Sequence, residues 1–129
     1  MRDTLLLVDD NPVQTFGRRA ILGRLFREVV TATSASEAIR LLENAATAER
    51  FALVVTDHLM PGMNGPEFVR NLRKLTVDLP IIVLSGMPDV QEEYDGLSVV
   101  YRQKPFQPDM LLALASELTS NQAALSPTA

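Results

Sequence analysis

The chain contains no cysteine and no tryptophan, and aromatic residues make up only 5% of it. Without cysteine there is no disulfide framework and no thiolate zinc site, which is a composition that intracellular proteins tolerate freely. The few aromatics offer no stacking platform for single-stranded nucleic acid. The 12 basic residues are outnumbered by 16 acidic ones, giving a formal charge of -4, and no basic block could follow a phosphate backbone. We therefore expect no direct binding to nucleic acid.

Long hydrophobic runs are also missing. Only the short apolar run 5–8 precedes Asp9, which is far too short for a signal peptide or a membrane span. A chain of 129 residues fits one domain that buries its own core. We expect a cytoplasmic protein without membrane contact, with its domain at 1–119. Residues 120–129 are small, polar or Pro without periodicity, and are expected to form a disordered tail or linker stub.

Short apolar runs bounded by polar residues indicate strands buried on both faces of a parallel sheet. Such strands are expected at 4–8, 28–32, 51–56, 81–84 and 98–103. The intervening segments predict helices at 12–26, from 33–37 onward, at 66–75, at 88–95 and from 108. Because parallel strands need right-handed crossovers, this alternation predicts an α/β fold with a doubly wound five-stranded sheet and five helices. Periodicity alone does not give the strand order.

The first helix should begin at Pro12, after a cap formed by Asn11. Its inner side is expected to carry the apolar residues Val13, Phe16, Ala20, Ile21 and Leu25. Its solvated face is expected to carry the arginines Arg18, Arg19 and Arg24.

Polar side chains follow four of the expected strands at the point where each strand ends. They are Asp9 and Asp10 after the first, Asp57 after the third, Ser85 after the fourth and Lys104 after the fifth. The carboxyl ends of parallel strands meet at one edge of a sheet, so these groups should gather there. Three converging carboxylates would repel one another without a cation. The set therefore predicts a site for a hard divalent cation and a phosphoryl group.

The spacing of these motifs adds a family resemblance. They are Asp9-Asp10, the loop Asp57-x-x-Met60-Pro61-Gly62-Met63-x-Gly65, Ser85, and Lys104-Pro105-Phe106. Together and in this order they are specific, and over residues 4–119 the chain resembles the CheY-like receiver domain of bacterial two-component response regulators. The resemblance implies a flavodoxin-like sheet with strand order 2-1-3-4-5.

The resemblance also implies how the acidic residues act. Asp57 would be the phosphoacceptor, taking a phosphoryl group from a phosphohistidine on a sensor histidine kinase or a histidine phosphotransfer protein. Asp10, Asp57 and the backbone carbonyl of Leu59 would be direct ligands of Mg²⁺, and Asp9 would hold a metal-bound water. An aspartyl phosphate is a reasonable product, because a carboxylate is a competent nucleophile toward phosphorus.

The remaining motif residues would bind the phosphoryl group and report its presence. Lys104 would pair with phosphoryl oxygens, and a cis peptide to Pro105 would direct it into the site. Ser85 would donate its hydroxyl group to the phosphate. Tyr101 would turn inward as the switch residue, although a half-buried packing tyrosine is nearly as good an interpretation. The switched surface would bind a downstream protein partner that the sequence does not identify.

Two departures from the family pattern bear on function. The segment between Ser85 and Lys104 is shorter than usual, which predicts a short fourth helix. Leu59 and Met87 are apolar where polar residues are frequent in the family. We expect these two side chains to exclude water and to lengthen the lifetime of the phosphorylated form.

The resemblance implies a signalling module that is not an enzyme, although it assists its own phosphorylation and dephosphorylation. Two other functions fit the residues less well. A Mg²⁺-dependent phosphotransfer hydrolase with an aspartate nucleophile would need a second acidic residue at the position of Leu59. It would also need a cap insertion long enough to enclose a substrate. A nucleotide-binding α/β domain would need a Gly-rich loop after the first strand, which the chain lacks. His58, beside Asp57, is expected to point away from the site by strand alternation.

Overall fold

The structure is a computed structural model that describes residues 2–60 and 62–124. Pro61 of the loop motif and residues 125–129 of the expected tail lie outside the described residues. Among the described residues, no helix is both long and apolar enough to cross a membrane.

Five parallel strands form one sheet in the order β2-β1-β3-β4-β5. They are β1 (Thr4–Val8), β2 (Glu28–Ala32), β3 (Phe51–Asp57), β4 (Ile81–Ser85) and β5 (Val100–Gln103). The order confirms the flavodoxin-like sheet that the resemblance implied. Every residue of the three central strands β1, β3 and β4 is buried, which explains why these segments are continuous apolar runs in the sequence.

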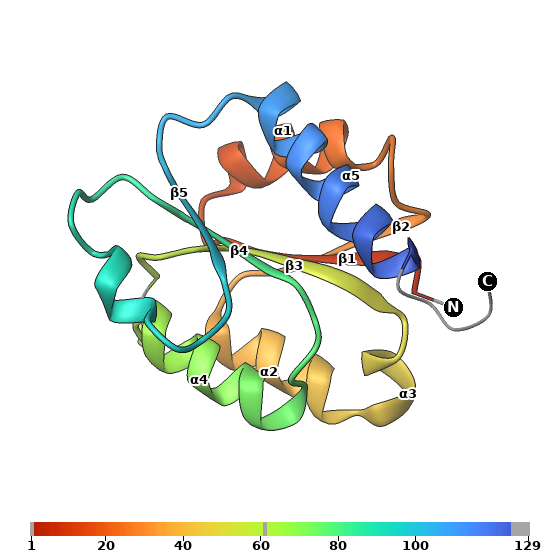
Figure 1. Cartoon of the computed structure of the whole chain (residues 1–129), viewed down its shortest axis with the longest axis horizontal. Coiled ribbons are helices and arrows are strands. Elements are labelled where there is room, and N and C mark those ends of the chain that lie inside the picture. The colour runs from red at the N-terminus through yellow and green to blue at the C-terminus, as the bar shows by residue number, and fades with distance from the viewer. Residues whose placement is uncertain (1, 61, 125–129) are drawn as a thin grey trace.

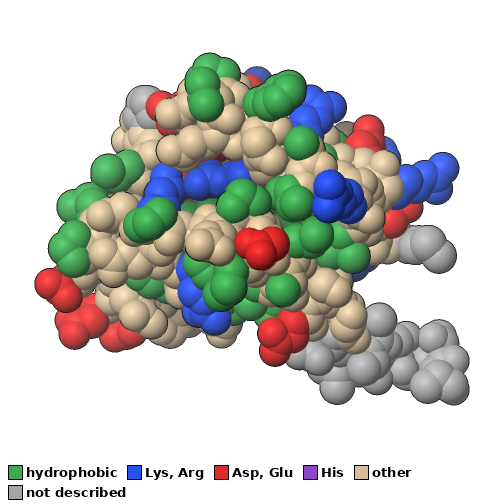
Figure 2. Space-filling view, turned by 90° about the horizontal axis from the view of Figure 1, so that it is seen from above, with side chains coloured by type: hydrophobic (Ala, Val, Ile, Leu, Met, Phe, Trp, Pro, Cys, Tyr) green, Lys and Arg blue, Asp and Glu red, His purple; other side chains and the backbone are tan. Residues whose placement is uncertain are grey.

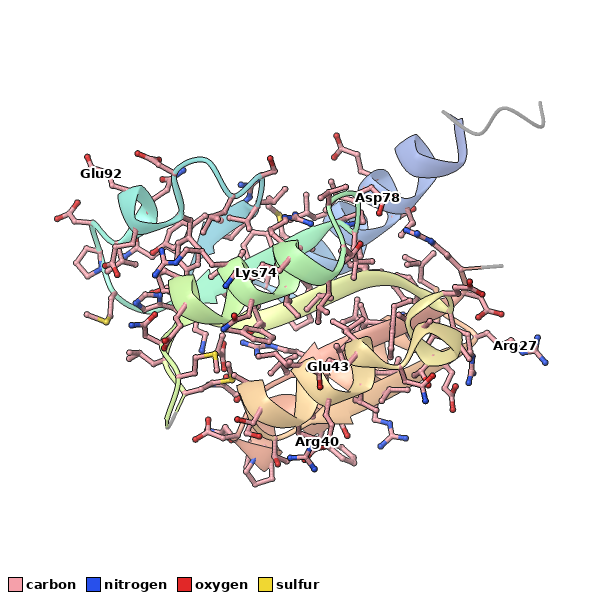
Figure 3. All side chains as sticks on the ribbon, turned by 90° about the horizontal axis from the view of Figure 1, so that it is seen from below. Arg27, Arg40, Glu43, Lys74, Asp78 and Glu92 are labelled. Atoms are coloured by element: carbon pink, nitrogen blue, oxygen red, sulfur yellow. The ribbon has the colours of Figure 1, made fainter. Side chains whose placement is uncertain are left out.

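Helices cover both faces of this sheet (Figure 1). They are α1 (Pro12–Leu22), α2 (Ala35–Glu43), α3 (Ala45–Ala48), α4 (Gly65–Leu75), the single 3₁₀ turn η1 (Gln91–Tyr94) and α5 (Pro108–Ala124). Helices α1 and α5 lie on one face, and α2, α3 and α4 on the other. Strand side chains alternate between two cores, with Leu5 and Leu7 in one and Leu6 and Val8 in the other. Figure 3 shows the α2 and α4 side, where Arg40, Glu43 and Lys74 lie on the outer surface.

Asparagine caps start the helices that follow β1 and β3. The Asn11 side chain accepts hydrogen bonds from the backbone N–H groups of Val13 and Gln14. The Asn64 side chain accepts one from Glu67 at 2.8 Å. Each cap satisfies N–H groups that the first helical turn leaves unpaired. The chain can therefore turn into a helix soon after the acidic residues that end these strands.

The prediction for the inner face of α1 was wrong for four of its five residues, and only Ile21 packs against the core as expected. Val13 and Phe16 are 80% and 78% exposed, and Ala20 and Leu25 are also exposed. Figure 2 views the molecule from the α1 and α5 side and shows hydrophobic side chains standing out on that surface. The helix also ends at Leu22 and does not reach Phe26. Its C-terminal half packs on the core through Leu22, whereas its N-terminal half lies at the polar edge of the sheet, where there is little apolar surface to cover.

The chain between β4 and β5 is reduced, as the shortness of this segment predicted. Its helical part is η1 alone. Arg73 of α4 holds the chain beyond it, because its guanidinium donates to the carbonyl oxygens of Leu97 at 2.8 Å and Ser98 at 2.9 Å. A third bond, to the carbonyl of Leu79 at 2.7 Å, ties the same group to the start of β4. Burial lowers the pKa of Arg73 from its usual value.

The C-terminal boundary differs from the expected one. Helix α5 continues to Ala124, so residues 120–124 are helical and do not belong to a disordered tail. The helix was not predicted this far because residues 120–124 are small or polar and show no apolar periodicity.

Candidate functional site

Asp57 is the last residue of β3 and is only 4% exposed. Two cations contact its Oδ1 atom. Lys104 Nζ lies 2.8 Å away and a guanidinium nitrogen of Arg18 lies 3.3 Å away. These contacts offset the charge of a carboxylate that is largely removed from water. The predicted meeting of Asp57 and Lys104 at the carboxyl edge of the sheet is therefore present in the structure.

Asp9 follows β1 and is also buried. Its Oδ1 atom accepts a hydrogen bond from the backbone N–H of Asn11 at 2.9 Å, and its Oδ2 atom accepts one from Arg18 at 2.8 Å. Burial raises the pKa of Asp9 to about 6, and the neighbouring Asp57 carboxyl group acts in the same direction. Asp9 and Asp57 are therefore close neighbours whose charges oppose each other.

Arg18 was expected in solvent, and that prediction was wrong. Only 14% of its side chain is exposed, and it bridges Asp9 and Asp57. A signal for this position exists in the sequence, since Arg18 lies two helical turns after the Asn11 cap and one turn after Gln14, on the same face of α1. Arg19, its neighbour, is exposed as expected.

Lys104 is held between two partners. Besides Asp57, its Nζ donates a hydrogen bond to Oε1 of Gln14 at 3.2 Å. The Lys104–Pro105 peptide bond is cis, as expected. The backbone N–H of Lys104 also donates to the carbonyl of Ser85 at 2.6 Å. Helix α1 thus supplies one polar group, Gln14, to the lysine and another, Arg18, to the two carboxylates.

Ser85 and Tyr101 meet at the backbone of Met87, and neither side chain is hydrogen-bonded to Asp57. The Ser85 hydroxyl oxygen accepts a hydrogen bond from the Met87 N–H at 3.0 Å. The Tyr101 hydroxyl donates to the Met87 carbonyl at 3.0 Å. A movement of the Ser85 hydroxyl toward Asp57 would therefore disturb the same short loop that Tyr101 holds.

The oxygen ligands of the site fit a magnesium ion. Mg²⁺ in proteins is usually held by one or two carboxylates together with waters and phosphate oxygens, and Asp9 and Asp57 supply such a pair. Among the described residues, no group of three or more acidic or histidine side chains is arranged to hold a metal. Asp10 is exposed, so its role as a direct ligand stays a prediction. The same holds for the Leu59 carbonyl.

His58 takes no part in this cluster of charges. Its ring Nδ1 and the Tyr94 hydroxyl oxygen are hydrogen-bonded at 2.6 Å, and both residues are buried. Tyr94 also packs against Tyr101, with ring centroids 6.1 Å apart. The pairing links the end of β3 to η1. Sequence reasoning missed it because no periodic pattern relates the two positions.

Comparison with known proteins supports the receiver-domain resemblance of the sequence. A family model described as the response regulator receiver domain matches residues 5–116. The chain is 33% identical to the C4-dicarboxylate transport transcriptional regulatory protein DctD of Pseudomonas aeruginosa, over 84% of this chain and 23% of that protein. It is 31% identical to the regulatory protein VanRB of Enterococcus faecalis, over 95% and 54% respectively. The chain thus spans about half or less of the length of these relatives.

Solved structures of similar size share the fold. A CheY-like receiver domain protein from Methanospirillum hungatei superposes with a TM-score of 0.87 at 26% identity, covering 98% of this chain and 100% of that one. The chemotaxis response regulator CheY4 of Vibrio cholerae gives a TM-score of 0.78 at 28% identity, with 92% and 99% coverage.

Proposed function

The chain belongs to the response regulator receiver family, and on that premise we propose that Asp57 accepts a phosphoryl group from a phosphohistidine. An Asp57 carboxylate oxygen forms a bond to phosphorus while the bond between phosphorus and the histidine nitrogen breaks. The imidazole leaves with the bonding electrons and takes up a proton from solvent. The donor would be a sensor histidine kinase or a histidine phosphotransfer protein. Family membership disfavours the hydrolase alternative.

One observation carries the assignment of Asp57. Its buried Oδ1 atom lies 2.8 Å from Lys104 Nζ at the carboxyl edge of the sheet. A lysine in this position can move with the incoming phosphoryl group and pair with its oxygens as a compact point charge. A bound Mg²⁺ would offset the repulsion between the Asp57 carboxylate and the phosphoryl group. Asp10, Asp57 and the Leu59 carbonyl would be direct ligands of that ion, and Asp9 would hold a water bound to it.

Phosphorylation would then be converted into a change of surface. The Ser85 hydroxyl would leave the Met87 N–H and donate to a phosphoryl oxygen, and the loop that Tyr101 contacts would follow. Such a local charge change can bias a two-state element. The altered surface would bind a downstream protein in the cytoplasm. Both curated relatives described above are named as regulatory proteins and are longer than this chain, which supports a regulatory output.

Intact-mass analysis tests the assignment. Wild type, Asp57→Asn and Asp78→Asn are incubated with acetyl phosphate, with and without Mg²⁺. Asp78 is a suitable control because it is exposed and paired with Arg2, away from the site. We expect one added phosphoryl group in wild type and in Asp78→Asn, dependent on Mg²⁺, and none in Asp57→Asn. Equal labelling of the Asp57 variant would refute the proposal.

A further inference from the structure

Arg18 has no role in the phosphoryl transfer described above, yet it contacts both buried carboxylates of the site. Its guanidinium lies 2.8 Å from Asp9 Oδ2 and 3.3 Å from Asp57 Oδ1. The positive charge of the guanidinium therefore faces the carboxyl groups of both aspartates. We propose that Arg18 is a tethered counter-cation that competes with Mg²⁺ for Asp9 and Asp57 and thereby sets the metal affinity of the site. The identity of the metal rests on the proposed function.

The hydrogen bonds of Asp9 show why the competition is direct. One of its oxygens is engaged by the Asn11 N–H and the other by Arg18. The Asn11 contact belongs to the turn that starts α1, so it stays in place as long as the helix does. A metal, or a metal-bound water, that approaches Asp9 therefore meets oxygens that are already engaged, and it has to share the Oδ2 atom with Arg18 or displace the arginine. Arg18 also shares Oδ1 of Asp57 with Lys104.

Burial makes this competition energetically significant. The Asp9 side chain is fully buried and that of Arg18 is 14% exposed, so the pair is screened far less than a surface ion pair. Breaking the pair leaves a buried carboxylate that only another cation can compensate. Mg²⁺ gives up its hydration shell reluctantly, so an arginine already in contact should weaken metal binding measurably.

The arrangement on α1 allows Arg18 to leave without disturbing Lys104. Gln14 lies one turn before Arg18 and holds the lysine. The lysine keeps its contacts to Gln14 and Asp57 when the arginine withdraws. Arg18 thus acts on the metal, and Lys104 remains available for the phosphoryl group.

Calorimetric titration with magnesium chloride alone tests the inference on the full chain. The variants are Arg18→Gln, Arg18→Lys and the control Arg19→Gln, which removes the same charge from the exposed neighbouring position of α1. We expect Arg18→Gln to bind Mg²⁺ more tightly, on the order of tenfold. Arg18→Lys should fall between that variant and wild type, and Arg19→Gln should stay within roughly twofold of wild type.

Thermal unfolding gives a second readout that separates competition from a purely structural role. In a chelating buffer Arg18→Gln should melt below wild type, because Asp9 loses the cation that contacts it and Asp57 keeps only Lys104. Saturating Mg²⁺ should raise its melting temperature by more than it raises that of wild type. If Arg18→Gln binds Mg²⁺ no more tightly than wild type, including the case in which neither binds, the inference is wrong. Acetyl phosphate labelling of wild type judges the proposed function separately.

Discussion

Nδ1 of His58 lies 2.6 Å from the hydroxyl oxygen of Tyr94, in a pair buried between the end of β3 and η1. Burial raises the pKa of Tyr94 above its usual value, and the charge of Glu93 adds to the effect, so the phenol keeps its proton at neutral pH. The residue before His58 is Asp57. The reduced connection between β4 and β5 is therefore attached directly to the strand that carries the proposed phosphoacceptor.

Replacing Tyr94 by Phe should destabilise the domain by about 1 to 2 kcal/mol, because the buried His58 nitrogen loses its hydrogen bond. Tyr101→Phe is the matched control. It removes a hydroxyl that binds the Met87 carbonyl at a more exposed position, and should cost roughly 0.5 kcal/mol. Urea unfolding measures both. A Tyr101 variant as destabilised as the Tyr94 variant would show that the buried pair is not the stronger anchor.

Replacement of Gly65, at the start of α4, by alanine is predicted to destabilise the domain. A Cβ atom there would collide with the Tyr94 hydroxyl and approach the His58 carbonyl to 3.0 Å. Gly65→Ala should therefore lose roughly 2 kcal/mol or more. Gly17→Ala, inside α1 with nothing within 4 Å of the added atom, should instead gain about 0.5 to 1 kcal/mol. Opposite signs of the two changes in chemical denaturation support the packing argument, and equal signs contradict it.

The fold was predictable because its signals are local or shared by the family. Continuous apolar runs marked the three central strands, and the ordered motifs led to the strand order that periodicity could not supply. The face of α1 was not predictable in this way. An amphipathic interpretation assumes that a helix covers a core along its whole length, but the N-terminal half of α1 lies over a polar site, so Val13 and Phe16 are exposed and Arg18 is not.

The site residues also divide into those that local or family signals predict and those that depend on tertiary packing. Asp57 and Lys104 could be brought together from the sequence because strand ends of a parallel sheet share one edge. Arg18 comes from a helix face, where an arginine is usually solvated, and only its helical spacing from Asn11 and Gln14 distinguished it from Arg19. The His58 and Tyr94 pair depends on how η1 lies on α4, which only the three-dimensional structure shows.

The raised pKa of Asp9 predicts a pH dependence of stability. Its folded pKa is about 6 and its ordinary value is 3.8. Below pH 3.8 the carboxyl is protonated in both states and its stabilising contribution is complete. As the pH rises through about 6 the folded state must release the proton, and that contribution is lost. In a chelating buffer, Asp9→Asn should therefore gain stability relative to wild type from pH 4 to 7, by roughly 2 kcal/mol. A constant difference between the two melting curves across this range would contradict the raised pKa.

Lys104→Ala should impair signalling more than metal binding. Lys104 offsets the charge of Asp57, so its removal need not weaken Mg²⁺ affinity, but the phosphorylated state loses a partner for the phosphoryl oxygens. We expect the phosphorylation-dependent change in hydrogen exchange near Tyr101 to be lost. Lys74→Ala, exposed on α4 (Figure 3), is the control and should behave as wild type. Loss of metal affinity with an intact exchange response would assign Lys104 a different role.

The lifetime of the phosphorylated form should depend on Leu59 and Met87. Their side chains are 64% and 40% exposed, so polar replacements there leave the hydrophobic core intact. Hydrolysis of an aspartyl phosphate needs a water in line behind phosphorus, and polar side chains at these positions could orient it, whereas apolar ones cover the approach.

Leu59→Asn, Met87→Glu and the double variant should lose phosphate faster than wild type, by on the order of tenfold for an oriented water. Dephosphorylation is followed at fixed Mg²⁺ after removal of the phosphodonor. Equal decay in all four proteins, or slower decay in the polar variants, would mean that water exclusion by these side chains does not set the lifetime.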